Sequence, residues 1–79
     1  MSKASAYFTV NSIGGKHGAK ELKSELDKLA GVISVSVSDS SGNIAVDFDT
    51  TGVRQEDLKT KIENLGYDIT NVRLENHIM

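Results

Sequence analysis

The 79-residue sequence predicts an α+β fold with the element order strand, helix, strand, strand, helix, strand. Three observations support this prediction. Apolar and polar residues alternate in four segments, as in half-buried strands, and they recur every three or four residues in two others, as in amphipathic helices. Glycine follows each helical segment and marks its end. The length suits one domain, expected over residues 1–79 with its core over about 6–74.

The first strand, a loop and the first helix occupy the N-terminal third of the chain. Alternation over residues 6–11 predicts a half-buried strand. Three glycines within five residues, from Gly14 to Gly18, then predict a loop. Apolar residues recur at helical spacing from Ala19 onward, which predicts a helix that stops at Gly31.

A hairpin is expected next. Ile33, Val35 and Val37 alternate with serines over residues 33–38, so this strand should turn its apolar side chains inward and its serines to water. The segment "DSSGN" has the residue types of a turn. Alternation resumes over residues 44–49, which completes two antiparallel strands.

The C-terminal third predicts a second helix over residues 54–65 and a last strand that starts at Tyr67. The apolar positions of this strand change parity between Ile69 and Val72, which indicates a bulge. The tail over residues 75–79 is expected to be loose. The whole order is that of a ferredoxin-like βαββαβ sandwich, a four-stranded antiparallel sheet with two helices on one face.

Composition excludes several classes of function. The chain has no cysteine, so disulfides, thiolate metal sites and thiol nucleophiles are absent. A formal net charge of −2 gives no indication of the positively charged surface that DNA- or RNA-binding proteins use to contact phosphates. No apolar run is long enough to span a membrane, and the N-terminal segment lacks the apolar stretch of a secretory signal. We therefore expect a soluble cytoplasmic protein that binds neither nucleic acid nor membrane.

Three segments carry a family resemblance: "LAGV" at residues 29–32, "VDFD" at 46–49 and "LGYD" at 65–68. With the helix between them, they resemble heavy-metal-associated domains, the family of copper chaperones, over about residues 6–72. The family binds metal in a loop of the form G-M-x-C-x-x-C. In this register the loop residues are Ser12, Ile13, Gly14, Gly15, Lys16, His17 and Gly18.

Both cysteine positions of the loop are therefore glycine, at Gly15 and Gly18. The family holds Cu(I) through two thiolates, because soft ligands select soft ions. Glycine supplies no side-chain ligand. The resemblance thus implies the fold, with weak or absent Cu(I) binding and a role in protein interaction.

Histidine offers an alternative metal site. His17 lies between the two former cysteine positions, and imidazole binds copper, zinc and nickel. His77 and Met79 could add donors, and two chains could share one ion. This second hypothesis is a protein of altered metal specificity that takes a divalent or copper ion at His17. We expect a monomer or a weak homodimer.

A lysine cluster suggests a docking face. Lys16, Lys20 and Lys23 lie toward the start of the first helix, where the helix dipole is also positive, so an acidic partner could dock there. In the family this loop face approaches partner domains, which implies docking at the face of residues 12–18 together with Tyr67. The alternatives are a solvated helix face, with Lys23 paired to Asp27, and an anion held by the glycine-rich loop.

Catalysis has little support in the sequence. No Ser/His/Asp set appears at a suggestive spacing, and Asp47 and Asp49 are expected on the water-facing side of the sheet. The arginine-bearing loop of an acylphosphatase, which shares this fold class, is missing. The protein is predicted not to be an enzyme. A third hypothesis is a ligand-sensing module of the ACT type, which shares the order of elements.

Overall fold

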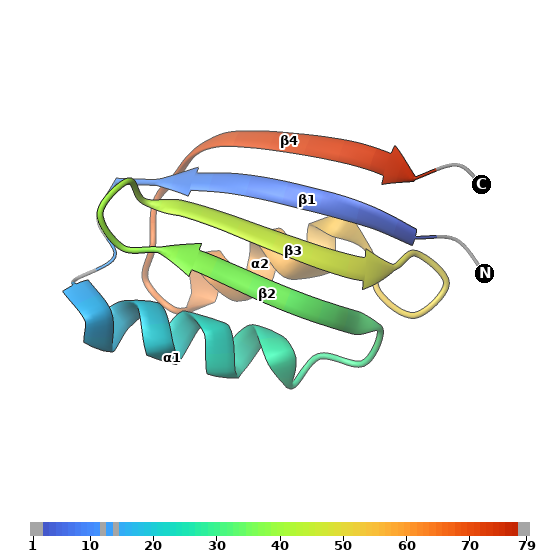
Figure 1. The fold of residues 1–79 in the computed structure, drawn as a ribbon, viewed down its shortest axis with the longest axis horizontal. Helices are drawn as coiled ribbons and strands as arrows, with labels where there is room; N and C mark the ends of the chain where they lie inside the picture. Colours follow the sequence, from blue (N-terminus) through green and yellow to red (C-terminus); the bar gives the residue numbers. More distant parts are fainter. Residues whose placement is uncertain (1–2, 12, 14, 78–79) are drawn as a thin grey trace.

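The computed structural model describes residues 3–11, 13 and 15–77. Its elements, in chain order, are β1 (Lys3–Val10), α1 (Gly15–Asp27), β2 (Val32–Ser38), β3 (Asn43–Asp49), α2 (Gln55–Asn64) and β4 (Ile69–His77). The strands form one antiparallel sheet in the order β2-β3-β1-β4. The predicted ferredoxin-like arrangement is confirmed (Figure 1).

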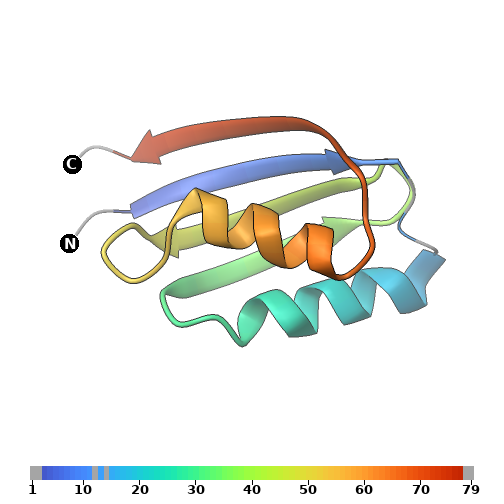
Figure 2. The same cartoon turned by 180° about the vertical axis from the view of Figure 1, so that it is seen from behind.

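The core lies between the sheet and the two helices. Alternate residues of the central strands point toward the helix layer, where they meet the apolar stripe of each helix. Helix α2 crosses the back of the sheet, and α1 runs alongside β2 at its border (Figure 2). The largest fully buried side chains are Phe8, Phe48, Leu22, Leu26, Ile44, Leu58, Ile62 and Val46.

Helix α1 begins earlier than the sequence predicts. The glycine-rich segment was expected to be a loop as far as Gly18, with the helix starting at Ala19, but α1 starts at Gly15. Glycine is a poor helix former by about 1 kcal/mol relative to alanine, which favours a loop here. Packing opposes that preference, because Ile13 is buried just before the helix and Leu22 is buried one turn after Gly18.

Ile33 does not face the core, contrary to the alternation in the sequence. The register of β2 against β3 shifts between Val32 and Ser34, so Ile33 is the extra residue of a β-bulge. Ile33 is 55% exposed, while Val32 packs against the core in its place. A bulge changes which face each residue occupies, and period-two alternation cannot reveal it.

Strand β4 carries the predicted bulge and also extends further than expected. Thr9 pairs with Asn71 but Val10 pairs with Ile69, which leaves Thr70 as the extra residue. The strand begins at Ile69 and not at Tyr67. Its residues through His77 pair with β1 back to Lys3, so the described part of the expected loose tail is strand. Hydrogen bonding along β1 outweighs the polar composition of this segment.

Two turns meet at one end of the helix layer. Helix α1 ends at Asp27, four residues before the predicted stop at Gly31. Gly31 has a φ of +93° and lies in the turn that leads into β2, where the Val32 N–H donates to the Leu29 carbonyl at 3.2 Å. A Cβ at Gly31 would lie 2.9 Å from the carbonyl carbon of Gly52, in the turn before α2. The Asp49 N–H also donates to the Gly31 carbonyl at 2.7 Å. Glycine is therefore needed at position 31 for both conformation and space.

Candidate functional site

The candidate site is the end of the molecule where β1 leads into α1. Ile13 is buried, with 2% of its surface exposed. His17 is exposed in the first turn of α1, and Gly18 follows it. Ser12 and Gly14 lie outside the described residues, while Gly15 and Lys16 belong to α1.

Gly18, the second former cysteine position, lies directly against backbone. A Cβ built at Gly18 would lie 1.6 Å from the carbonyl oxygen of Ile13 and 3.1 Å from the hydroxyl oxygen of Tyr67. Real Cβ atoms do not approach backbone oxygen this closely, so any side chain at Gly18 would force the segment at Ile13 to move. The space that a cysteine side chain would need is filled by the chain itself.

Tyr67 closes this corner from the other side. It comes between α2 and β4, and its hydroxyl donates to the Ile13 carbonyl at 3.4 Å. Burial raises the pKa of Tyr67, and the nearby Glu21 carboxylate adds to this effect. Both causes favour the neutral phenol, which is the form that can donate the hydrogen bond.

The donor set does not fit a soft metal ion. The chain contains no thiolate, and no three His, Cys, Asp or Glu side chains gather into a metal-holding group among residues 3–11, 13 and 15–77. His17 contributes one imidazole, whereas protein zinc sites use three or four ligands. The residue His77 pairs with Lys3 at the far end of the sheet from α1's first turn (Figure 1). The fold therefore separates the two histidines, and Met79 lies outside the described residues.

Lysines dominate one side of α1. Lys20 and Lys23 are exposed, and the first turn of the helix has no acidic residue. The two lysines line a hollow of about 330 Å³ between α1 and β2, together with Ala19, Val35, Ser36 and Val37. Lys16 belongs to the same stretch of helix by sequence. The positive charge of the lysines thus adds to that of the helix dipole.

The ion pairs of α1 lie on another side of the helix. Glu25 contacts Lys28 at 2.8 Å and Lys61 of α2 at 3.3 Å. Hydrogen bonds from Lys28 and then Lys61 hold the pKa of Glu25 below its usual range. In the described part of the chain no ion pair joins Lys23 to Asp27, so the pairing expected from the sequence is not found. The charge of Lys23 remains available to a partner.

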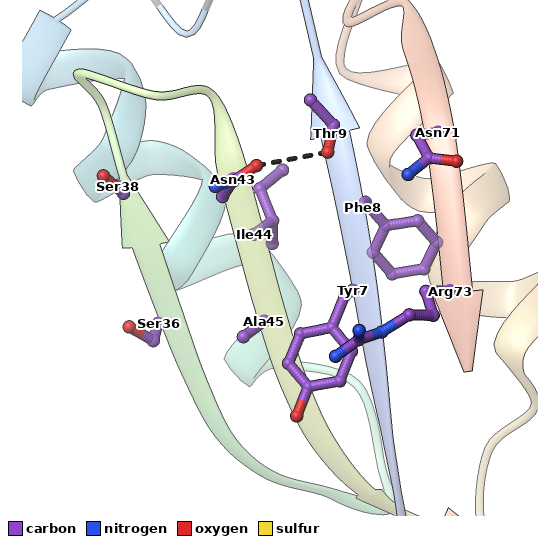
Figure 3. A pocket seen from close by; sticks show the side chains of 10 residues that line it. All are labelled: Tyr7, Phe8, Thr9, Ser36, Ser38, Asn43, Ile44, Ala45, Asn71 and Arg73. Atoms are coloured by element: carbon purple, nitrogen blue, oxygen red, sulfur yellow. Dashed lines mark hydrogen bonds between the residues drawn. The ribbon is translucent and has the colours of Figure 1, made fainter. Parts of the chain in front are cut away.

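The open face of the sheet carries a second hollow, of about 380 Å³. Strand register places its side chains in two cross-strand rows, Ser36–Ala45–Tyr7–Arg73 and Ser38–Asn43–Thr9–Asn71. The Arg73 guanidinium lies 4.8 Å from the centre of the Tyr7 ring, and Thr9 donates to Asn43 at 3.1 Å (Figure 3). None of these side chains is a thiolate, imidazole or carboxylate, so this hollow is not a metal site.

Three features escaped the sequence-based prediction. The carbonyl of Ile13 has no signal in a side-chain pattern, and Glu21 comes near Tyr67 only through packing. The stacking of Tyr7 with Arg73 was also missed. Residue parity along β1 and β4 puts both side chains on the open face, so aligning the two strands would have suggested that pair.

No helix in the described ranges is both long enough and apolar enough to cross a membrane. The longest is α1, with 13 residues. It carries lysine and glutamate throughout, and a spanning helix needs about 20 mainly apolar residues.

Comparison with known proteins agrees with the geometry. The family described as "Heavy-metal-associated domain" matches residues 8–68. The copper chaperone CopZ of Staphylococcus saprophyticus is 41% identical over 54 residues, which cover 68% of this chain and 75% of that protein. The copper chaperone CopZ of Staphylococcus haemolyticus is 35% identical over 62 residues, 78% of this chain and 91% of that protein.

A solved structure supports the same assignment. The structure described as "CopZ metallochaperone" has a TM-score of 0.79 and 27% identity, and the match covers 84% of this chain and 98% of that one. The family match of residues 8–68 runs from the end of β1 through α1, β2, β3 and α2 and stops before β4, and no cysteine is present in the chain. The chain therefore belongs to the heavy-metal-associated domain family.

Proposed function

We propose that this chain is a protein-interaction module of the heavy-metal-associated family, which docks on an acidic partner and does not hold Cu(I) through side-chain donors. The docking face comprises residues 12–18, of which Gly15–Gly18 begin α1, with the adjacent lysines of α1 and Tyr67. The observation that carries the proposal is the corner at Gly18, where the carbonyl of Ile13 fills the place of a side chain. Because backbone atoms fill the space beside Gly18, there is no room for a cysteine side chain, which is the ligand that the family uses.

Charge supports the docking part of the proposal. Lys20 and Lys23 are exposed beside the positive end of α1, and the molecule as a whole carries a net charge of −2. A cationic patch on an anionic molecule orients an acidic partner toward that patch as it approaches. The contact should weaken as ionic strength rises, because exposed charges are screened by salt.

Competition for copper tests the first half of the proposal. The purified protein is mixed with Cu(I) bound to a chromogenic chelator under anaerobic conditions, and the chelator colour reports any transfer. We expect the colour to persist at one equivalent of protein. Stoichiometric uptake of Cu(I) by the wild-type chain would contradict the proposal, since it would require donors that the loop lacks.

The histidine hypothesis is tested by the same titration with Zn(II) and Ni(II), followed by amide NMR. Shifts confined to residues 13–20 at micromolar metal, lost in His17→Ala, would favour a metal site of altered specificity over the docking proposal. If the shifts persist in His17→Ala, the histidine is not the ligand. Absence of any shift, together with binding to poly-L-glutamate but not to poly-L-lysine, is the result we expect.

A further inference from the structure

The border strand β2 differs from most sheet edges in having no charged residue. Its sequence, Val32–Ser38, contains only valine, isoleucine and serine. It has one strand neighbour, β3, so alternate backbone groups of β2 point away from the sheet. Natural proteins usually protect such an edge with charge, proline or irregular geometry. Here the bulge at Ile33 interrupts one end, and the stretch over residues 34–38 pairs in regular register.

The opposite border shows the contrast. Strand β4 carries Arg73 and Glu75, whose side chains lie 3.9 Å apart, and both are exposed. Charges of this kind discourage an added strand, because it would have to desolvate them. The two edges of the sheet thus differ: the β4 edge carries charged side chains, whereas the β2 edge carries none and runs beside α1, with a hollow between them (Figure 2).

The hollow beside β2 indicates what such a strand would carry. Lys20 and Lys23 lie on its α1 side, and Val35 and Val37 contribute apolar surface. A glutamate side chain suits both features, since its methylene groups can cover valine while its carboxylate reaches a lysine. The two lysines are three residues apart, about 4.5 Å along the helix axis. Glutamates two apart on a strand are separated by about 6.6 Å, a difference that flexible lysine side chains can span.

We infer that the β2 edge binds an extended acidic segment of a partner protein, which adds a fifth strand to the sheet and places alternate carboxylates against Lys20 and Lys23. This inference rests on the proposed docking function and names the form of the partner. A second copy of this chain suits the edge less well: its β2 has no carboxylate, and it would bring two more lysines to the same border. Main-chain hydrogen bonds would supply affinity, and the alternate carboxylates would supply specificity.

The test uses the full chain and a seven-residue peptide of alternating threonine and glutamate, acetylated and amidated at its ends. Amide NMR and hydrogen exchange report binding. We expect shifts across residues 34–38 and slower exchange at alternate amides of β2. A peptide with lysine in place of glutamate should not bind, because it meets like charge.

A peptide with the same side chains but with alternate backbone nitrogens methylated is the decisive control. It keeps the charge and loses the strand-pairing donors, so the inference requires that it bind at least about tenfold more weakly. If it binds as well as the unmodified peptide and shifts only α1, strand addition is wrong while charge-driven docking stands. If neither peptide binds, the strand-addition inference is wrong for acidic segments. Concentration-dependent shifts of β2 without peptide would overturn it in favour of self-association.

Protein variants test the lysines separately. The double variant Lys20→Gln, Lys23→Gln should bind the acidic peptide about tenfold more weakly, as expected for the loss of two exposed charge pairs. Lys3→Gln with Lys59→Gln removes the same charge away from the hollow and should change affinity less than about twofold. Equal weakening by the two double variants would show that net charge alone drives binding, and would overturn the assigned position of the carboxylates.

Discussion

At the scale of single residues, the absence of a side chain at Gly18 allows the backbone at Ile13 to lie directly against the first turn of α1. The carbonyl of Ile13 lies where a Cβ would be, and the hydroxyl of Tyr67 donates to that carbonyl. A glycine in a helix is usually a weakness in conformational terms. Here it lets the chain before α1 fold back against the first turn of the helix, which keeps Ile13 in the core.

Replacing Gly18 by alanine should therefore destabilise the protein. Helix propensity alone would raise the free energy of unfolding by about 1 kcal/mol. The collision with the Ile13 carbonyl should cost about 1–3 kcal/mol, so we expect a net loss of up to about 2 kcal/mol. Urea unfolding followed by circular dichroism measures the difference. Ser24→Ala, at an exposed position of the same helix, is the control and should give a gain of about 0.5 kcal/mol or less.

Gly31 and Gly66 provide a matched pair for the left-handed conformation. Both have positive φ, 93° and 98°, but a Cβ at Gly66 meets nothing within 4 Å, whereas one at Gly31 meets Gly52. Gly66→Ala should cost about 1–2 kcal/mol from backbone strain alone. Gly31→Ala should cost more, because it adds a steric clash. Equal losses in thermal unfolding would show that the two turns do not touch in solution.

At the scale of elements, the bulge in β2 explains why Ile33 and Ile44 should contribute differently to stability. Ile33 is 55% exposed and Ile44 is 1% exposed, although both lie in segments with the same alternation. Ile33→Ala should change the free energy of unfolding by no more than about 0.5 kcal/mol. Ile44→Ala should cost about 2–5 kcal/mol, because it leaves a cavity in the core. A large loss for Ile33→Ala would place its side chain inward and contradict the bulge.

The hydrogen bond from the Tyr67 hydroxyl to the Ile13 carbonyl should make stability fall at high pH, where the phenol loses its proton. Burial and Glu21 raise the pKa of Tyr67 in the folded state, whereas the unfolded chain titrates near its ordinary value of about 10. The contribution is fully present below that unfolded value and is lost as pH rises through the raised pKa. Ultraviolet titration should show one late tyrosine ionisation that Tyr67→Phe removes and Glu21→Gln shifts to lower pH. An unchanged late step in Tyr67→Phe would assign it elsewhere.

The same elements show how far sequence reasoning reaches. Periodicity predicts all six elements and the bulge near Thr70, because the buried faces of strands and helices repeat regularly. It fails at Gly15–Gly18 and at Ile33, where tertiary contacts override local preference. In the candidate site it finds His17 and the lysines, but it cannot find a backbone carbonyl at Gly18, since that contact depends on three-dimensional packing.

At the scale of the whole molecule, stability should not respond to copper. A ligand that binds only the folded state raises the melting temperature, and the gain grows as its concentration exceeds the dissociation constant. At one hundred times the dissociation constant the gain is about 2.7 kcal/mol, which a melting curve readily shows. We expect no shift on adding equimolar Cu(I) under anaerobic conditions. An increase of several degrees in the wild-type chain, absent in His17→Ala, would indicate a site at the imidazole.

The strand ends at Lys3 and His77 are register partners, so the described chain enters and leaves side by side, away from the first turn of α1 (Figure 1). A protein immobilised through either terminus would therefore be attached at the end away from the first turn of α1. The first turn of α1 would remain accessible to a partner in solution. Binding of poly-L-glutamate to the protein immobilised on a sensor surface should then show the same affinity whichever terminus is attached.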